Sequence, residues 1–442
     1  MSVSNASARP TADDTARADR SRWSVDTRWM VWLFGVAFVL RLIFVLAVQR
    51  DQFPTSDPAF YHGIATNLAN GDGFSSISGA PTAQWPPVYP FVLSLVYRVF
   101  GNDPQYGELF NVLVGAVTVP LLFFVARRAL GQREARFAGV FFAVMPGQIF
   151  FTDVLLSETL FTFTLVGIVA LAVVLRPSAR TALVMGLAIG IAALSRGEGP
   201  LLLVLPLAMW WNLLDRRTLA KYAAILVGAM VLVVVPWTIR NASVMGSFIP
   251  VSTNAGDTFY SGHNPRANGA ATYATPQVLA PVQKYSGAKR EVEQSKLLRK
   301  EAISWALHHP LDELGLIPAR FLSLNQGDGL AIGVWVVPGP LNPPISKPVR
   351  NSLDVLADFA YYSLLTLFIG SLLVFGRRLL GNAVLRGALI YIGVLVFLYS
   401  IVLYGNFRYR VPLEALMLLV AAPLAVKIWE LRDRVRVAAR AG

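Results

Sequence analysis

The chain has 442 residues, of which 55% are hydrophobic and only 15% are charged, and its net charge is +13. A composition this apolar excludes an ordinary soluble globule and predicts an all-α, polytopic membrane protein. The sequence contains no cysteine, which excludes disulfides, thiolate metal sites and cysteine nucleophiles. No basic run is interleaved with aromatic residues, so nucleic acid is not an expected partner.

The first 27 residues are polar and lack an apolar core, so they are not a signal peptide. Acidic and basic residues alternate there, and we expect residues 1–27 to form a disordered cytoplasmic tail.

Apolar segments then recur along the chain and predict a bundle of about ten transmembrane helices, within a range of about eight to twelve. Two segments are shorter than the roughly 20 residues that a full span needs, and another pair also fits one broken helix. The segments are 29–48, 106–126, 135–151, 155–175, 181–195, 199–214, 219–238, 355–376, 384–404 and 410–427.

Lysine and arginine concentrate in alternate connections, which is the pattern of cytoplasmic loops. It predicts that the N-terminus lies on the cytoplasmic side of the membrane and that the segments 50–105 and 241–351 lie on the outer side. The inner residues are Arg20, Arg22, Arg28, Arg127, Arg128, Arg133, Arg136, Arg176, Arg180, Arg216, Arg217, Lys221, Arg377, Arg378, Arg386, Arg432, Arg434 and Arg436.

These observations divide the chain into five parts. The expected parts are the tail 1–27, a transmembrane core 28–240 that carries the first outer loop 50–105, an outer loop and helical segment 241–351, C-terminal transmembrane helices 352–430, and a basic cytoplasmic tail 431–442.

The first outer loop is polar and rich in glycine, proline and aromatic residues. Asp57 stands before a proline and suits the start of a helix that runs to about Asn70 and ends at Gly71. A second short helix should begin after Pro87 and end before Gly101. We therefore expect two interfacial helices joined by a flexible loop.

The second outer segment is too long for a passive connector. We expect a charged helix at 288–308, an amphipathic helix at 311–324 on or in the membrane, and a proline-rich strap at 338–348.

Two carboxylates on the outer side are candidates for catalysis. Asp57 suits a general base, although capping a helix explains it equally well. Glu158 lies near the outer end of an apolar span, where an ionisable group is costly, although a first-turn glutamate also suits the helix dipole. Together they leave open a divalent-cation site, which has weak support.

Four arginines lie on the same side, and two of them, Arg408 and Arg410, are candidates for binding a phosphate. Arg408 and Arg410 flank Tyr409 and follow Tyr404 at the entrance to the last span, where anchoring by tyrosine at the interface is the alternative. Arg196 lies in a turn beside Glu198 and can simply pair with it, and Arg240 lies at an outer helix end.

Other kinds of site lack support in the sequence. His263 has no second histidine or cysteine at ligand spacing, so a zinc site is not expected. No P-loop or Rossmann glycine motif occurs, so a nucleotide-sugar site of the usual kind is not expected either.

Several of these motifs resemble landmarks of the GT-C glycosyltransferases, in particular bacterial relatives of protein O-mannosyltransferases and aminoarabinose transferases. The resemblance covers about residues 30–427 and depends on the order of the motifs and on their shared outer side. The motifs are SDPAFYHGIATNLANGDGF at 56–74, WPPVYP at 85–90, LSET at 156–159, LSRGEG at 194–199, GHNPRANG at 262–269 and RYRVP at 408–412.

The resemblance implies a GT-C-like bundle and an inverting transfer of a hexose or pentose from a polyprenyl-phosphate donor, without a required cofactor. The acceptor is a glycan, lipid or protein of the cell envelope, reached on the outer face. Asp57 and Glu158 match the family's two acidic landmarks. Some relatives carry a lysine where Gln84 and Trp85 stand. The resemblance therefore implies that an arginine takes its place at the donor phosphate, and the candidates are Arg196, Arg240, Arg408 and Arg410. Contacts to substrate are expected from Tyr61, Trp85, Tyr89, His263 and Asn264.

A transporter or flippase of a lipid-linked or anionic solute is the alternative from another functional class. Inverted repeats and conspicuous mid-span charges, which would favour it, are not visible in the sequence.

Overall fold

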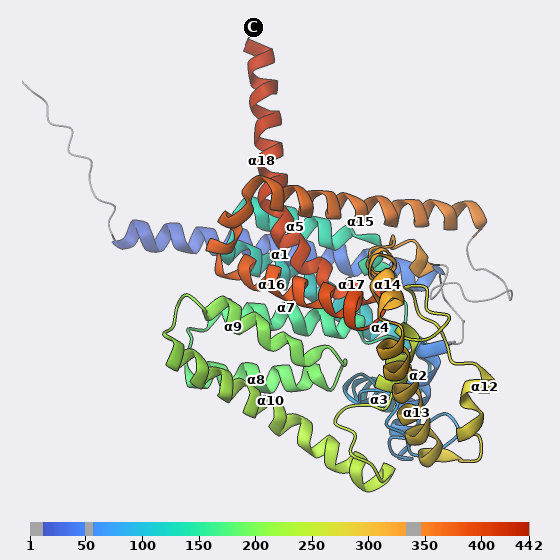
Figure 1. Ribbon diagram of the computed structural model, residues 1–442. Helices are drawn as coiled ribbons and strands as arrows, with labels where there is room; N and C mark the ends of the chain where they lie inside the picture. Colours follow the sequence, from blue (N-terminus) through green and yellow to red (C-terminus); the bar gives the residue numbers. More distant parts are fainter. Residues whose placement is uncertain (1–11, 49–55, 333–345, 442) are drawn as a thin grey trace, which may run out of the picture.

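The structure is a computed structural model that describes residues 12–48, 56–332 and 346–441. These residues are mostly helical, and an isolated antiparallel bridge joins Ser75 to Pro81 (Figure 1). The helices of the bundle are α1 Ala12–Val48, α4 Pro104–Ala129, α5 Gln132–Val144, α6 Pro146–Phe150, α7 Glu158–Val174, α8 Ala179–Ala193, α9 Val204–Trp210, α10 Arg216–Met245, α15 Lys347–Phe375, α16 Ala383–Phe397 and α18 Glu414–Ala441.

Every apolar segment expected from the sequence is helical. Within the described residues, six helices are long and apolar enough to cross a bilayer, and α7, α8 and the stretch Gly199–Trp210 are apolar but shorter. The expected fold class, an all-α bundle, is therefore confirmed, whereas the count of about ten spans stays a prediction.

The bundle is held by one large apolar core. Leu33 of α1, Phe123 of α4, Phe161 of α7 and Leu416 of α18 are almost fully buried in it. Large apolar side chains also remain exposed on the outside, such as Leu232 of α10 and Leu373 of α15. An exposed apolar surface around an apolar core is what an integral membrane protein presents to lipid.

The first and last helices extend into the segments that the sequence analysis expects to be tails. The structure extends α1 back to Ala12, into the segment expected as a disordered tail, and residues 1–11 lie outside the described residues. The last helix, α18, runs through the expected basic tail to Ala441, and Figure 1 shows its end projecting beyond the bundle.

The two helices expected in the first outer loop are confirmed as α2 Ser56–Asn70 and α3 Val88–Phe100. A glycine with positive φ follows each helix: Gly71 (φ 93°) after α2 and Gly101 (φ 104°) after α3. This backbone conformation is open to glycine without steric cost, so both helices end where the sequence indicates.

The second outer segment contains α11 Ala255–Gly262, α12 Pro276–Leu279, α13 Gly287–His308 and α14 Pro310–Leu324. The helices expected at 288–308 and 311–324 are thus confirmed, while residues 338–345 of the proline-rich strap lie outside the described residues.

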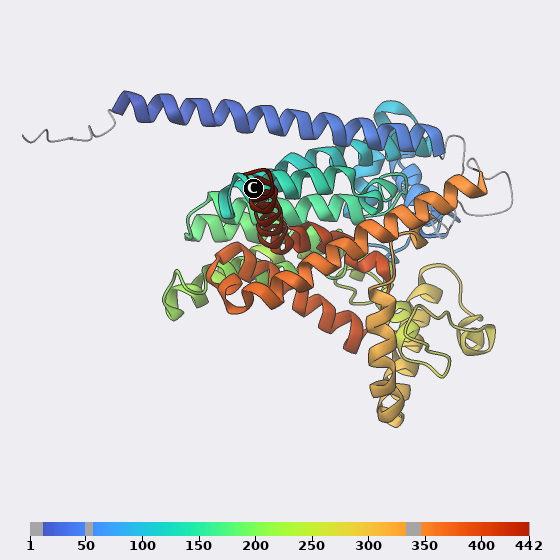
Figure 2. The same cartoon turned by 90° about the horizontal axis from the view of Figure 1, so that it is seen from above.

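Glu291 of α13 ties this segment to the first loop. Its carboxylate accepts hydrogen bonds from the Thr82 hydroxyl (2.6 Å), the Ala83 amide (2.9 Å) and the Thr253 hydroxyl (2.7 Å). Both segments consequently lie at the same end of the bundle (Figures 1 and 2).

The connections rich in arginine gather at the opposite end. Arg127 forms an ion pair with Asp26 (3.0 Å), and the amide of Asn382 donates to the carbonyl of Ala129 (2.7 Å). Figure 1 shows that α15 ends and α16 begins at this end, away from α2 and α3. The fold therefore separates the expected inner and outer connections spatially.

This separation predicts the outcome of cysteine labelling, which the cysteine-free sequence makes simple. Ser78→Cys and Ser286→Cys, both at exposed positions, should react with a membrane-impermeant maleimide in intact cells. Ala179→Cys, exposed at the other end, should react only after permeabilisation. Labelling of Ala179→Cys in intact cells would show that this end of the bundle faces outwards and would contradict the expected topology.

Candidate functional site

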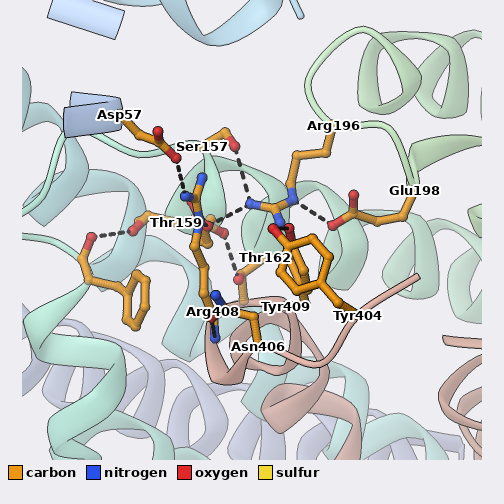
Figure 3. A network of polar contacts seen from close by, with 12 residues as sticks. Asp57, Ser157, Thr159, Thr162, Arg196, Glu198, Tyr404, Asn406, Arg408 and Tyr409 are labelled. Carbon is orange, nitrogen blue, oxygen red and sulfur yellow. Dashed lines mark hydrogen bonds and ion pairs between the residues drawn. The ribbon is translucent and has the colours of Figure 1, made fainter. Parts of the chain in front are cut away.

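Charged side chains from distant parts of the chain meet where the first outer loop contacts the bundle (Figure 3). Asp57 comes from the first turn of α2 and Glu158 is the first residue of α7. Arg196 and Glu198 lie in the turn between α8 and the short helix Gly199–Leu203, and Arg408 belongs to α17, Phe407–Arg410. We call these five residues the charge network.

Arg408 stands between two carboxylates of the network. Its Nη1 donates to Asp57 Oδ2 at 2.6 Å, and its Nε donates to Glu158 Oε1. Arg196 reaches the same Glu158 oxygen with Nη1 at 2.8 Å, and its Nε donates to Glu198 Oε1 at 2.5 Å. Charges of opposite sign thus alternate from Asp57 to Glu198.

Local structure directs Arg408 towards these carboxylates. Asn406 precedes α17, and its side-chain oxygen accepts from the Arg408 amide at 3.0 Å, which satisfies one of the free donors of this helix end. The neighbouring Tyr409 donates or accepts a 2.5 Å hydrogen bond with Tyr404. The Tyr409 ring also lies 6.0 Å from the Arg196 guanidinium, so the two arginines share one aromatic neighbour.

Burial makes this arrangement electrostatically strong. Glu158 is fully buried, whereas 10% of the Arg408 side chain and 27% of the Asp57 side chain remain exposed. Burial by itself disfavours the charge on Arg196, but the attraction of Glu158 and Glu198 outweighs it and raises the pKa of Arg196 further above its usual value. Arg196 is therefore a permanent cation, and solvent reaches the network from the Asp57 side.

The arrangement of Asp57 and Glu158 can be compared with the requirements of the divalent-cation site that the sequence leaves open. The Arg408 guanidinium already occupies the space between Asp57 and Glu158. Among the described residues, no group of three or more histidine, aspartate or glutamate side chains could hold a metal ion. A metal bridging Asp57 and Glu158 would have to displace the arginine, so these residues do not fit a metal site.

Three of the expected substrate-contacting residues form an aromatic wall beside the network. The Tyr61 ring lies 5.1 Å from that of Trp85 and 5.2 Å from that of Tyr89, and all three are buried. Tyr89 donates to the side-chain oxygen of Asn111. Burial raises the pKa of Tyr61 to about 12, so its hydroxyl is a neutral hydrogen-bonding group at physiological pH.

Arg410 points away from Arg408 and joins a second buried cluster. It donates through Nη2 to Asp328 and through Nη1 to the carbonyl of Gln326 (3.1 Å), and its guanidinium lies 3.3 Å from the Tyr361 ring centroid. Residues two positions apart in a helix face different directions, which explains the divergence. The structure therefore brings Arg408, but not Arg410, to Asp57 and Glu158.

Arg240 also lies outside the charge network. Its guanidinium donates to the carbonyls of Thr82 (2.7 Å) and Phe74 (2.8 Å) and stacks on Trp237 at 4.9 Å. These contacts fasten the first outer loop to α10.

His263 and Asn264 lie in the second outer segment and have hydrogen-bond partners within the chain. His263 Nε2 donates to the carbonyl of Val402 (2.8 Å), and Nδ1 lies 2.9 Å from the Glu313 carboxylate. The Asn264 amide donates to the carbonyl of Tyr260 (2.7 Å) and to the Thr272 hydroxyl (2.6 Å). The structure does not bring either residue into the charge network.

Sequence reasoning missed the residues that support the site from a distance. Glu291 lies in the charged run KREVEQSK, where nothing distinguishes it from its neighbours. Asp328 and Glu414 are separated by 86 positions and are both fully buried around Arg410. For this cluster, the sequence offered one signal. Glu414 is a carboxylate at the start of an apolar helix, where a charged residue needs a partner.

Two comparisons of the sequence with known proteins gave the following results. Residues 84–239 match the family model of dolichyl-phosphate-mannose-protein mannosyltransferase. A search of the curated proteins found no match.

Among solved structures, the apo oligosaccharyltransferase of Archaeoglobus fulgidus is similar with a TM-score of 0.53 at 13% identity, covering 93% of this chain and 52% of that one. The same enzyme, AglB, in complex with an inhibitory peptide and dolichol-phosphate gives 0.52 at 13% identity, covering 94% and 52%. ArnT from Cupriavidus metallidurans bound to undecaprenyl phosphate gives 0.45 at 16% identity, covering 90% and 78%. This chain spans about half the length of the archaeal structures, and the likeness to them concerns the fold.

The burial of Glu158 predicts a large effect on stability. Glu158→Gln removes the charge that compensates two buried guanidinium groups, and losing one partner of a buried ion pair costs about 3–5 kcal/mol. We expect a marked fall in the thermal unfolding midpoint of the purified protein in detergent. Asp57→Asn is the matched control, because its partly exposed side chain pairs with one arginine only, and its midpoint should fall much less. Equal midpoints for wild type and Glu158→Gln would contradict this account.

Proposed function

This chain has the fold of the GT-C glycosyltransferases, and from that premise we propose that it is an integral-membrane inverting glycosyltransferase. It transfers a hexose or pentose from a polyprenyl-phosphate donor to an acceptor of the cell envelope on the outer face of the bacterial plasma membrane. The match of residues 84–239 to the dolichyl-phosphate-mannose-protein mannosyltransferase model supports this reaction class.

One observation carries the proposal. Arg408 contacts both Asp57 and Glu158, so a candidate base and a candidate phosphate-binding cation are adjacent. Glycosyl transfer from a lipid phosphate needs both groups: a carboxylate that takes the proton of the acceptor hydroxyl, and cations that stabilise the departing phosphate.

Asp57 has the better position of the two carboxylates for the proton transfer. Its side chain is partly exposed, whereas Glu158 is fully buried and contacts two arginines. We assign Asp57 as the general base that activates the acceptor, and Glu158 as the residue that positions Arg408 and Arg196. Asp57 takes the proton of the acceptor hydroxyl while the acceptor oxygen attacks the anomeric carbon of the sugar and forms the new glycosidic bond. The bond from that carbon to the donor phosphate breaks, and polyprenyl phosphate leaves with the bonding electrons.

Arg408 and Arg196 are assigned to the donor phosphate. A guanidinium forms two parallel hydrogen bonds to phosphate oxygens, and its charge opposes the negative charge that grows on the leaving group. When a phosphate draws Arg408 towards itself, the ion pair with Asp57 weakens and the carboxylate becomes available to the acceptor. Donor binding and release of the base are thereby coupled.

The place of the network suits a donor that stays in the bilayer. It lies between the first turn of α2 and the starts of α7 and α17, and we propose that a lipid phosphate at the membrane surface reaches it there. AglB and ArnT have been solved with dolichol-phosphate and undecaprenyl phosphate respectively, and we propose the same chemical class of lipid here. The donor bond is already activated, so no nucleotide is consumed.

Asp57→Asn tests the base. The variant removes the proton acceptor while retaining a residue that suits a helix start, so turnover should fall by about 10²–10⁴ while the protein still folds. Release of free polyprenyl phosphate from a polyprenyl-phosphate sugar, followed by chromatography, measures the activity. Near-normal turnover would reduce Asp57 to a structural role, and wild-type protein that moves the lipid without releasing polyprenyl phosphate would indicate a flippase.

Arg408→Lys tests the phosphate contact. The substitution conserves the charge but loses the bidentate geometry, so kcat/KM for the donor should fall at least several-fold while the KM for the acceptor changes less. Arg98→Lys, an exposed arginine on α3 that donates to the carbonyl of Leu68, is the matched control and should resemble wild type. Arg410→Lys should change the donor KM less than Arg408→Lys, because Arg410 belongs to the separate Asp328 cluster. A larger change of the donor KM in Arg410→Lys would reassign the phosphate contact.

A further inference from the structure

The second outer segment contains a cavity of about 450 Å³, within the usual size of small-molecule sites. It lies between α13 and the loop that follows α11, and none of its lining residues belongs to the charge network. One wall is a single face of α13, because its members are three or four positions apart. This wall consists of Glu301, Ser304, Trp305 and His308.

The opposite wall is a loop folded by its own hydrogen bonds. Asn264 contacts the Tyr260 carbonyl and the Thr272 hydroxyl, and its side-chain oxygen accepts from the Arg266 amide at 2.9 Å. These bonds occupy both the nitrogen and the oxygen of the Asn264 side chain. Asn264 therefore holds the loop in shape and is not free to bind a ligand. Tyr260 and Arg266 then face α13 across the cavity.

The lining combines a flat aromatic surface with groups that donate and accept hydrogen bonds. Trp305 stacks on His309 with ring centroids 3.6 Å apart, which fixes the plane of the indole. Among the described residues, the carboxylate of Glu301 has no hydrogen-bond or ion-pair partner, so it is available to a ligand. A sugar ring presents C–H faces that pack on an aromatic ring and hydroxyls that bind carboxylates and guanidinium groups.

Charge narrows the class of ligand further. The lining contains one arginine and one glutamate, both close enough to Tyr260 to affect its ionisation in opposite directions. The Arg266 guanidinium already donates to the carbonyl of Tyr273, and Glu301 adds a negative charge to the same lining. The balance favours an uncharged, polyhydroxylated ligand over a phosphate.

We propose that this cavity binds a neutral saccharide unit of the acceptor, which makes a glycan the substrate that is glycosylated. This proposal rests on the proposed function, because it concerns the second substrate of the same enzyme. A peptide acceptor is the competing class, but the cavity offers no exposed strand edge for a peptide backbone.

The cavity is connected to the charge network by the loop before α17. His263, in the cavity wall, donates to the carbonyl of Val402, and the Gly405 amide donates to the carbonyl of Gly269 at 2.9 Å. Gly262 packs so closely on Leu403 that an added Cβ would lie 2.7 Å from its carbonyl oxygen. The cavity is thus held against the segment that leads into Asn406 and Arg408, which links the cavity to the network through one continuous stretch of chain.

Saturation-transfer NMR on the purified full-length protein without donor tests this binding. The probes are mannobiose, cellobiose, maltose and diacetylchitobiose, with an uncharged hexapeptide as the competing class. At least one disaccharide should bind, and Trp305→Ala should weaken its Kd by about ten-fold or more through loss of the stacking surface. Trp305→Phe, which keeps an aromatic ring, should weaken it less and guards against a folding defect in the alanine variant.

Glu301→Gln should also raise the Kd, because it replaces a charged acceptor by a weaker neutral one. Lys300→Gln is the matched control: it is the adjacent exposed residue, it does not line the cavity, and its Kd should equal that of wild type.

The outcomes separate this inference from the proposed function. Failure of all four disaccharides to bind, or equal Kd values in Trp305→Phe, Glu301→Gln and wild type, would overturn the saccharide site. Binding of the hexapeptide that Glu301→Gln and Trp305→Phe abolish would overturn it in favour of a peptide. Release of polyprenyl phosphate from the donor by wild-type protein, measured separately, tests the transferase activity whichever way the saccharide result falls.

Discussion

The arrangement of the site depends on one buried carboxylate, Glu158, which contacts guanidinium groups from two distant parts of the chain. A lone charge in this position would be very costly, and each of the three groups is stable there only because the others are present. Glu158 therefore fixes the start of α7, the turn after α8 and the short helix α17 relative to one another. The ion pair between Asp57 and Arg408 then attaches α2, and with it the first outer loop, to these three segments.

Polar ties farther from the network stabilise the segments that carry it. Arg240 holds two carbonyls of the first outer loop, Glu291 joins that loop to α13, and Arg410 fastens α17 to Asp328. Each tie satisfies backbone or charged groups that would otherwise be buried without partners, which is costly in a low-dielectric environment. We infer that these three residues act on the site by positioning, whereas Arg408 and Asp57 are placed to contact substrate.

The sequence predicted the helices well because helix formation has local signals. Apolar runs, the proline before α3 and the glycines after α2 and α3 each act within a few residues, and the structure confirms them. The acids and arginines expected on the outer side were also identifiable as candidates, since charge near an apolar span is costly. Which arginine meets which acid was not predictable, because Arg408 and Glu158 are 250 positions apart and their contact is set by helix packing. The same limitation hid Glu291, whose role depends on partners in another segment.

In the proposed function, the charge network receives the donor before it activates the acceptor. With all five groups ionised, three carboxylates face two guanidinium groups, so the network carries a net negative charge before substrate binds. A donor phosphate adds more negative charge and competes with Asp57 for Arg408. The carboxylate that would lose this contact is the one that is partly exposed to solvent, and the proton that it takes from the acceptor hydroxyl offsets the additional negative charge on the departing phosphate. In the proposed reaction, Asp57 therefore stays in its ion pair with Arg408 until a donor phosphate competes for that arginine.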